Sequence, residues 1–112
     1  MPDVFEALAA PARRAILDVL CERDGQTLFE ICSRLTMKHD LTLTRQAISQ
    51  HLDVLERAGL VRSRKAGRVR TYHLVPRRLA SAQHWLEVQR ARWNSRLNQL
   101  DNYLETLKEQ KL

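Results

Sequence analysis

The sequence predicts a mainly α-helical fold with one small β-hairpin. Only three Gly and three Pro occur among the 112 residues, which leaves little material for long loops or many turns. Apolar residues recur at steps of three and four along most of the chain, as in amphipathic helices. Residues 60–75 are instead rich in types that favour strands. The length fits one small domain, and 44% hydrophobic with 29% charged residues is typical of a folded chain.

Two helices are expected before Asp24-Gly25. Residues 3–9 predict a short helix. Pro11 then fits the first turn of a second helix, "PARRAILDVLCER", because its missing N–H costs nothing there. The Asp-Gly pair ends this second helix. The apolar residues of the two helices are Val4, Phe5 and Leu8 on one side of the first, and Ile16, Leu17 and Leu20 on the inward side of the second.

The next two helices have clear start signals. Residues 27–30 read Thr-x-x-Glu, a capping box, at the start of a third helix, "TLFEICSRL". Residues 36–43 follow as a connector with at most partial helical character. Thr44 then serves as the N-cap of a fourth helix over 44–58, and Gly59 ends that helix. The apolar faces consist of Leu28, Ile31 and Leu35 in the third helix, and Ile48, Leu52 and Leu55 in the fourth.

Residues 60–75, "LVRSRKAGRVRTYHLV", predict a β-hairpin with its turn at Ala66-Gly67 and a basic tip. An isolated hairpin is hardly stable in water, so this one must pack against the helices. From Pro76 the apolar residues keep helical spacing, broken at Gln89 or Arg90, which predicts a helix of roughly thirty residues. We therefore expect residues 1–76 and the C-terminal helix, 77–112, to form one continuous domain.

The last helix carries an apolar stripe that the rest of the chain is too small to cover. About thirty helical residues span about 45 Å, and each large apolar side chain left in water forfeits roughly 1.5–3 kcal/mol. A second copy related by a two-fold axis would bury the same stripe twice. The alternative, that the stripe folds back on the N-terminal helix, is compatible with a dimer. The expected dimer interface consists of Val4, Phe5, Leu8, Leu86, Trp93, Leu97, Leu100, Leu104 and Leu107.

The charge of the chain points to a polyanionic partner. The formal net charge is +6 with a pI near 10.0, and residues 57–78 contain eight Arg or Lys and no Asp or Glu. Such a run is either a solvated face or a surface for nucleic acid or an anionic membrane. No apolar run is long enough to cross a membrane, and the N-terminus lacks the features of a secretory signal. Cys21 and Cys32 are expected to be reduced core thiols, so a cytoplasmic location is expected.

Three short helices followed by a basic hairpin predict a winged helix-turn-helix in which the fourth helix reads DNA. Its front carries Gln, Arg and Ser, the residue types that pair with base edges. His51 has two interpretations, a contact with phosphate or with its own core. Asp53 would repel a DNA backbone, so we expect it to face the groove edge or a basic neighbour. The expected DNA contacts of this helix are Thr44, Arg45, Gln46, Ser49, Gln50 and His51.

The basic hairpin is the predicted wing. Its cations are expected to grip the DNA backbone or an adjacent minor groove, which gives affinity and salt dependence more than sequence choice. Because alternate residues of a strand face opposite sides, about half of them should touch DNA. The expected wing contacts are Arg62, Arg64, Lys65, Arg68 and Arg70.

The stretches "ALAAPARRAILDVL" and "LTRQAISQHLDVLERAGLVRSRKAGRVRTYHL" resemble the ArsR-type family of bacterial winged-helix repressors. The most specific parts are Ser-Gln-His-Leu at 49–52 and Ala-Gly-Leu-Val at 58–61, and the resemblance covers nearly the whole chain. It implies a homodimer that binds an operator in double-stranded DNA. Many members of the family release DNA when a metal ion or another signal binds.

The metal sites of that family do not carry over to this chain. In the third helix Cys32 matches one thiolate ligand, but Arg34 replaces the other, and one thiolate beside a cation is a poor site for a soft metal. The family's second site pairs Asp and His on the last helix, where this chain offers only His84. The C-terminal helix is similar to the metal-independent branch. We therefore expect no metal and no cofactor, and the sequence names no inducer.

These features predict a homodimeric, sequence-specific DNA-binding transcriptional regulator, foremost a repressor without a metal inducer. Two alternatives stay open: a metal- or ligand-responsive repressor of the same family, and a protein-interaction module that sequesters a transcription component. RNA binding is disfavoured because two Trp, two Tyr and two Phe provide little stacking surface. No catalytic constellation or phosphate-binding glycine loop is present in the sequence, so the chain is not expected to be an enzyme.

Overall fold

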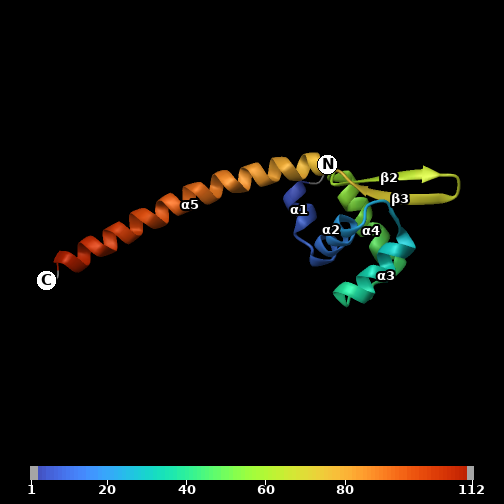
Figure 1. Cartoon of the computed structure of the whole chain (residues 1–112), viewed down its shortest axis with the longest axis horizontal. Coiled ribbons are helices and arrows are strands. Elements are labelled where there is room, and N and C mark those ends of the chain that lie inside the picture. The colour runs from blue at the N-terminus through green and yellow to red at the C-terminus, as the bar shows by residue number, and fades with distance from the viewer. Residues whose placement is uncertain (1–2, 111–112) are drawn as a thin grey trace. The chain divides into compact units, whose positions relative to one another are not determined.

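The computed structural model describes residues 3–110 and is mainly helical, as predicted (Figure 1). Within this range the helices are α1 (Val4–Leu8), α2 (Pro11–Glu22), α3 (Leu28–His39), α4 (Arg45–Arg57) and α5 (Pro76–Gln110). The strands in the same range are β1 (Gln26–Thr27), β2 (Val61–Ala66) and β3 (Val69–Leu74). Contacts divide the chain into two units, one ending at Ala80 and the other beginning at Ser81, so that the division falls inside α5. The predicted domain limits, 1–76 and 77–112, stay a prediction.

The core of the first unit lies where α2, α3 and α4 pack together. Seven large apolar side chains of these helices are almost fully buried: Ile16, Leu20, Ile31, Leu35, Ile48, Leu52 and Leu55. All seven were predicted to face inward. Leu17 and Leu28, predicted in the same way, are half-buried and pack against this cluster, as do Val4 and Leu8 of α1. Burial of this kind stabilises by roughly 1.5–3 kcal/mol for each large side chain, so the three-helix core fixes where α4 lies.

The predicted helix starts are confirmed. The N–H of Glu30 donates to Thr27 Oγ1 at 3.2 Å, and the N–H of Thr27 donates to Glu30 Oε1 at 3.2 Å. The N–H of Thr27, and after it the Thr27 hydroxyl, which also donates to Glu30 Oε1 at 3.2 Å, hold the pKa of the Glu30 carboxyl below its ordinary value. Pro11 occupies the first turn of α2, as expected. The capping box therefore fixes the direction in which the chain enters α3.

The third helix is longer than predicted, because residues 36–39 of the expected connector continue it. Lys38 in this added turn forms an ion pair with Glu22 of α2, which ties the turn to the neighbouring helix. Asp40 ends the helix in the left-handed conformation with φ 51°, and the N–H of Leu41 donates back to Leu35 O at 3.1 Å. Since no glycine marks this end, the sequence carried only a weak stop signal.

The hairpin belongs to a three-stranded antiparallel sheet in the order β1-β3-β2. The register pairs Ala66 with Val69, so the turn consists of Gly67 and Arg68 rather than Ala66 and Gly67 as predicted. Gly67 adopts φ +63°, a conformation that suits glycine in a two-residue hairpin turn. The third strand was not predicted, because Gln26 and Thr27 alone carry no alternating pattern. Gln26 is fully buried, and its Nε2 donates to Val19 O at 2.8 Å.

One prediction about the cysteines is wrong. Both thiols are free, but Cys21 is exposed rather than buried in the core, while Cys32 is half-buried and packs against it. The inward face of α2 is occupied by the neighbouring Val19 and Leu20. Since successive helical residues turn by 100°, Cys21 lies beyond the edge of that face.

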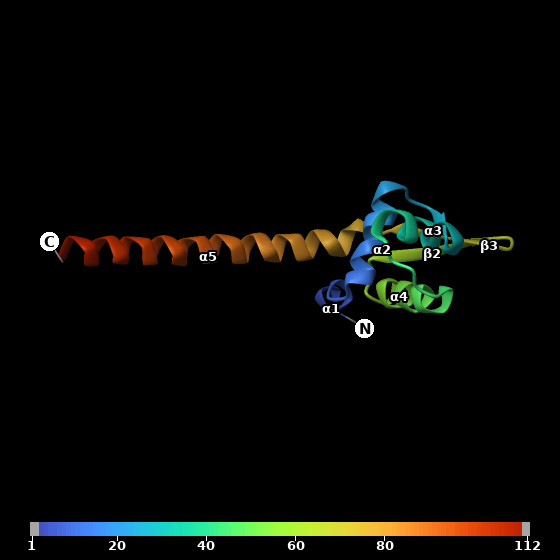
Figure 2. The ribbon, with the colours of Figure 1, turned by 90° about the horizontal axis from the view of Figure 1, so that it is seen from below.

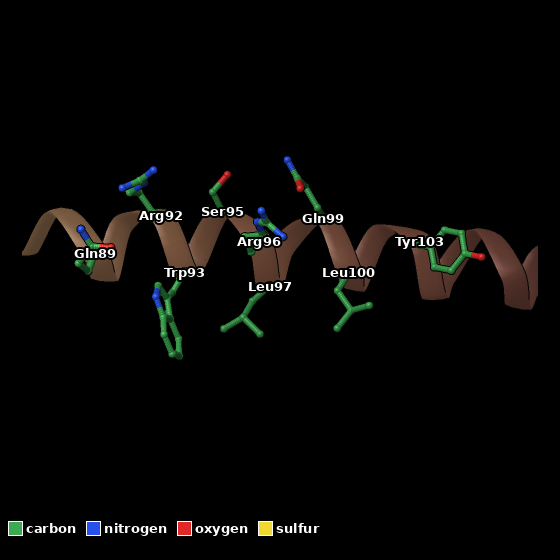
Figure 3. Close-up of a pocket in the computed structure, with 9 residues that line it drawn as sticks. All are labelled: Gln89, Arg92, Trp93, Ser95, Arg96, Leu97, Gln99, Leu100 and Tyr103. Atoms are coloured by element: carbon green, nitrogen blue, oxygen red, sulfur yellow. The ribbon is translucent and has the colours of Figure 1, made fainter. Parts of the chain in front are cut away.

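The second unit is the remainder of α5, a continuous helix that shows no break at Gln89 or Arg90. The interruption seen in the sequence affects the apolar stripe and not the backbone. In Figure 3, Trp93, Leu97 and Leu100 extend from one side of this helix. Within residues 3–110, no helix combines the length and the apolar character needed to cross a membrane.

Candidate nucleic-acid interface

The first two turns of α4 present an apolar back and a polar front. Thr44 is the N-cap, as predicted, and its Oγ1 accepts from the N–H of Ala47 at 3.1 Å. The back of the helix, Ile48 and Leu52, is buried in the core. All four polar residues of the front are exposed, and none of their side chains hydrogen-bonds to another described residue: Arg45, Gln46, Ser49 and Gln50. The donors and acceptors of this face are therefore available to a ligand.

His51, the last of the expected contacts on α4, lies differently. It is half-buried, and its Nδ1 is 3.3 Å from Nη1 of Arg13 on α2. Burial lowers the pKa of His51 below its ordinary value, and the charge of Arg13 lowers it further. The sequence left two interpretations of His51, a contact with a DNA phosphate and a contact with its own core. The structure shows a partner for the second, which is Arg13.

Two acidic residues of α4 have partners on neighbouring turns or strands. Asp53 forms an ion pair with Arg57 one turn further on, which confirms the expected basic neighbour. Glu56 accepts hydrogen bonds from the N–H of Ser63 at 3.2 Å and from its Oγ at 2.8 Å. The hydrogen bonds between Glu56 and Ser63 attach β2 to α4, so the wing is held in position relative to the helix.

The predicted wing is the hairpin of β2 and β3, which projects from the helices of its unit (Figure 1). All five cations expected in the wing are exposed. The register divides them: Lys65 pairs with Arg70 and shares its face, whereas Arg62 and Arg64 lie on the opposite face. Nη1 of Arg70 donates to Ser63 Oγ at 3.0 Å, so Arg70 extends the link from α4 into the wing.

The base of the wing is held by contacts that the sequence did not reveal. The carboxylate of Asp24 accepts from the N–H of Leu74 at 2.8 Å, and its other oxygen is 3.4 Å from Nδ1 of His73. The N–H of Gly25 donates to Tyr72 O at 3.0 Å. The Asp-Gly pair was interpreted only as the end of α2. Asp24 and Leu74 of β3 are fifty residues apart in the chain, so no local sequence pattern indicated the contact between them.

The protonation of the Cys32 thiol disfavours binding of a soft metal. Burial raises its pKa, which disfavours the thiolate that metals require. Arg34, at the position of the family's second thiolate, is 3.8 Å from the carboxylate of Glu22. Among residues 3–110, no group of three or more His, Cys, Asp or Glu side chains is placed to hold a metal ion.

A polar helix front and a basic wing on a three-helix core define a winged helix-turn-helix (Figure 2). The family model "Helix-turn-helix domain" matches residues 8–64. The uncharacterized HTH-type transcriptional regulator YuzN of Bacillus subtilis is 54% identical over 67 residues, which are 60% of this chain and 73% of YuzN.

Two solved structures extend the similarity to the fold. An ArsR-like transcriptional regulator from Rhodococcus sp. RHA1 has a TM-score of 0.69 and 32% identity, covering 92% of this chain and 88% of that one. An ArsR family transcriptional regulator has a TM-score of 0.66 and 32% identity, covering 81% of this chain and 87% of that one. This chain belongs to the ArsR-type family of winged helix-turn-helix transcriptional regulators, and the family expected from the sequence is thereby confirmed.

Proposed function

We propose that two copies of this chain bind an operator in double-stranded DNA and repress transcription without a metal inducer. The observation that carries the proposal is the exposed, unpartnered polar front of α4, flanked by a cationic wing. YuzN and the ArsR-type relatives are transcriptional regulators, which supports gene regulation rather than catalysis.

The front of α4 suits the edges of bases in a major groove. A Gln side chain can pair bidentately with adenine, an Arg with guanine, and a Ser hydroxyl with several groups. Gln46, Ser49 and Gln50 project from a helix whose back is fixed in the core, so the backbone that carries them is set before DNA arrives. A preorganised helix lowers the cost of ordering the backbone on binding. We expect Arg45 and Thr44, at the helix start, to meet a base or a phosphate.

The wing supplies charge more than sequence choice. Arg68 lies in the turn, and the register puts Arg62 and Arg64 on one face with Lys65 and Arg70 on the other. One face alone can meet the duplex while the turn residue reaches the backbone. Each phosphate contact releases counterions, so binding should weaken steeply as salt is raised.

The homodimer is inferred from the apolar face of α5. In the second unit five residues of the predicted interface are roughly half exposed or more: Leu86, Trp93, Leu97, Leu100 and Leu104. An exposed stripe of this size in a regulator marks an interaction surface. A second copy covers it with an identical stripe, and a two-fold dimer presents two α4 helices to two half-sites.

The absence of a metal inducer is inferred from the raised pKa of the Cys32 thiol in α3. A raised pKa keeps Cys32 as a thiol at neutral pH, and Arg34 stands where a second thiolate would be needed. We expect excess zinc, copper or arsenite to leave operator binding unchanged. A large loss of binding with any of them would favour the metal-responsive alternative instead.

Selection of bound duplexes from a random pool with the full-length protein tests the function. The expected result is a motif with two-fold symmetry whose half-sites lie about one helical turn apart. The matched control is the double variant Gln46→Ala, Ser49→Ala. Both residues are exposed, so we expect the variant to keep the fold and to enrich a looser motif. Failure of the wild-type protein to enrich any sequence would overturn sequence-specific binding. In transcription assays, a promoter overlapping the motif should lose activity when the protein is added.

A further inference from the structure

The guanidinium of Arg13 on α2 joins two other helices of the first unit. Its Nε donates to Ala7 O at 2.7 Å, and its Nη2 donates to Glu6 O at 3.0 Å. These carbonyls belong to the last turn of α1, and Glu6 O also accepts from the N–H of Ala9 at 3.2 Å. The remaining nitrogen, Nη1, faces Nδ1 of His51 on α4 at 3.3 Å. One side chain therefore connects the end of α1 with the polar helix.

The contact fixes the protonation of His51. Arginine offers only donors, so Nδ1 must accept the hydrogen bond, and the neutral ring then carries its proton on Nε2. Because burial and Arg13 lower the pKa of His51, the ring is neutral and the contact intact at neutral pH. As the pH falls through that lowered pKa, Nδ1 gains a proton and the hydrogen bond is lost. A second positive charge then faces the guanidinium.

The surroundings of His51 leave Arg13 as the dominant charged neighbour. The elements packed against α4 in its unit are α2, α3 and β2. Among the described residues, Arg13 is the charged group that shifts the pKa of His51. Several other charged groups of these helices have partners of their own, in the pairs Asp53 with Arg57, Glu56 with Ser63, and Glu22 with Arg34 and Lys38. Arg45 of α4 is exposed, and its side chain makes no hydrogen bond to another described residue.

We propose that Arg13 and His51 form a positioning pair that holds α4 in its operator-binding orientation, and that protonation of His51 weakens operator binding by breaking the pair. This inference rests on the proposed function. In this role His51 contacts Arg13 of its own chain rather than a DNA phosphate. It lies two residues from Ser49 and next to Gln50 on the same helix. The two roles differ in sign, since a phosphate contact would become stronger when the ring gains a proton.

Nuclear magnetic resonance of the imidazole nitrogens in the free full-length protein tests the pair without DNA. The expected result is an Nε2–H tautomer of His51, whose pKa moves up toward the ordinary value in R13Q. The matched control is R14Q, because Nη1 of Arg14 also donates to the end of α1, to Leu8 O at 2.7 Å. An Nδ1–H tautomer, or equal shifts in R13Q and R14Q, would overturn the pair.

Titration of operator affinity tests the functional link, with the duplex recovered by selection as the probe. H51Q keeps an acceptor but cannot titrate, whereas H51A removes the acceptor. At pH 8 the wild-type protein and H51Q should bind about fivefold more tightly than H51A, the effect of one ordinary hydrogen bond. As the pH falls below the lowered pKa of His51, the wild-type protein should lose this advantage relative to H51Q.

Two results would overturn the inference: equal affinities of the wild-type protein and H51A at pH 8, or a gain of affinity by the wild-type protein over H51Q in acid. The selection and resonance experiments separate the two proposals. If no duplex is enriched, the proposed function fails while the tautomer of His51 is still measured. If a duplex is enriched and the pH profiles of the wild-type protein and H51Q coincide, only the positioning role fails.

Discussion

The proposed dimer predicts how much the substitution Leu97→Ala on the apolar face of α5 should weaken dimerisation. The side chain of Leu97 is 56% exposed in the single chain. Truncation to alanine removes about three methylene equivalents, or about 2.4 kcal/mol if fully buried. Scaled by the exposed part that a partner would cover, the loss is about 1.3 kcal/mol per chain. A two-fold contact uses the residue twice, so the dimer loses about 2.6 kcal/mol and its Kd rises roughly 70-fold.

Sedimentation over a range of concentrations measures this change. Figure 3 supplies the matched control, because Gln99 extends from the side of the helix opposite Leu97. Gln99→Ala should leave the Kd within about threefold of the wild-type value, the range of ordinary surface substitutions. Circular dichroism verifies that both variants keep their helix. Equal Kd values for the two variants, or a wild-type monomer at micromolar concentration, would refute the reasoning.

Three further predictions concern DNA contacts and stability. Gln46→Ala or Ser49→Ala should cost roughly 1–3 kcal/mol at one base pair of each half-site and relax the sequence choice there. Competition with single-base variants of the selected duplex measures this, and unchanged specificity in both proteins would mean that another element reads the bases. Arg68→Ala should reduce the slope of log affinity against log salt by about 0.9 without changing the motif; an altered motif would contradict a backbone role. Thr27→Ala should lower the free energy of unfolding by about 1 kcal/mol, whereas Thr27→Ser keeps the cap. Urea titration measures both, and equal stability of the two variants would argue against the capping box.

Local sequence signals predicted the helices well. The capping box at Thr27 and the N-cap at Thr44 act within one turn, and the structure confirms both. The spacing of apolar residues identified the core, because burial of that face dominates the stability of the unit. The end of α3 was misplaced, since Asp40 provides the left-handed residue at a position where a glycine is the usual signal.

Contacts between residues distant in the chain could not be predicted. Asp24 holds β3 across fifty residues, and Arg13 meets His51 across 38. Neither pair leaves a periodic pattern, because each depends on how the helices pack. The turn of the wing was displaced by one residue for a related reason, since register is set by pairing along the whole hairpin. The polar front of α4 was predictable because it lies on one helix.

The central proposal is that paired α4 helices enter the major groove. The most direct test is the structure of the full-length protein bound to the selected duplex. The expected result is two copies of α4 in successive major grooves on one face of the DNA, about 34 Å apart, with Gln46 and Ser49 against base edges. A complex in which the front of α4 faces solvent or a protein partner, away from the bases, would contradict the proposal.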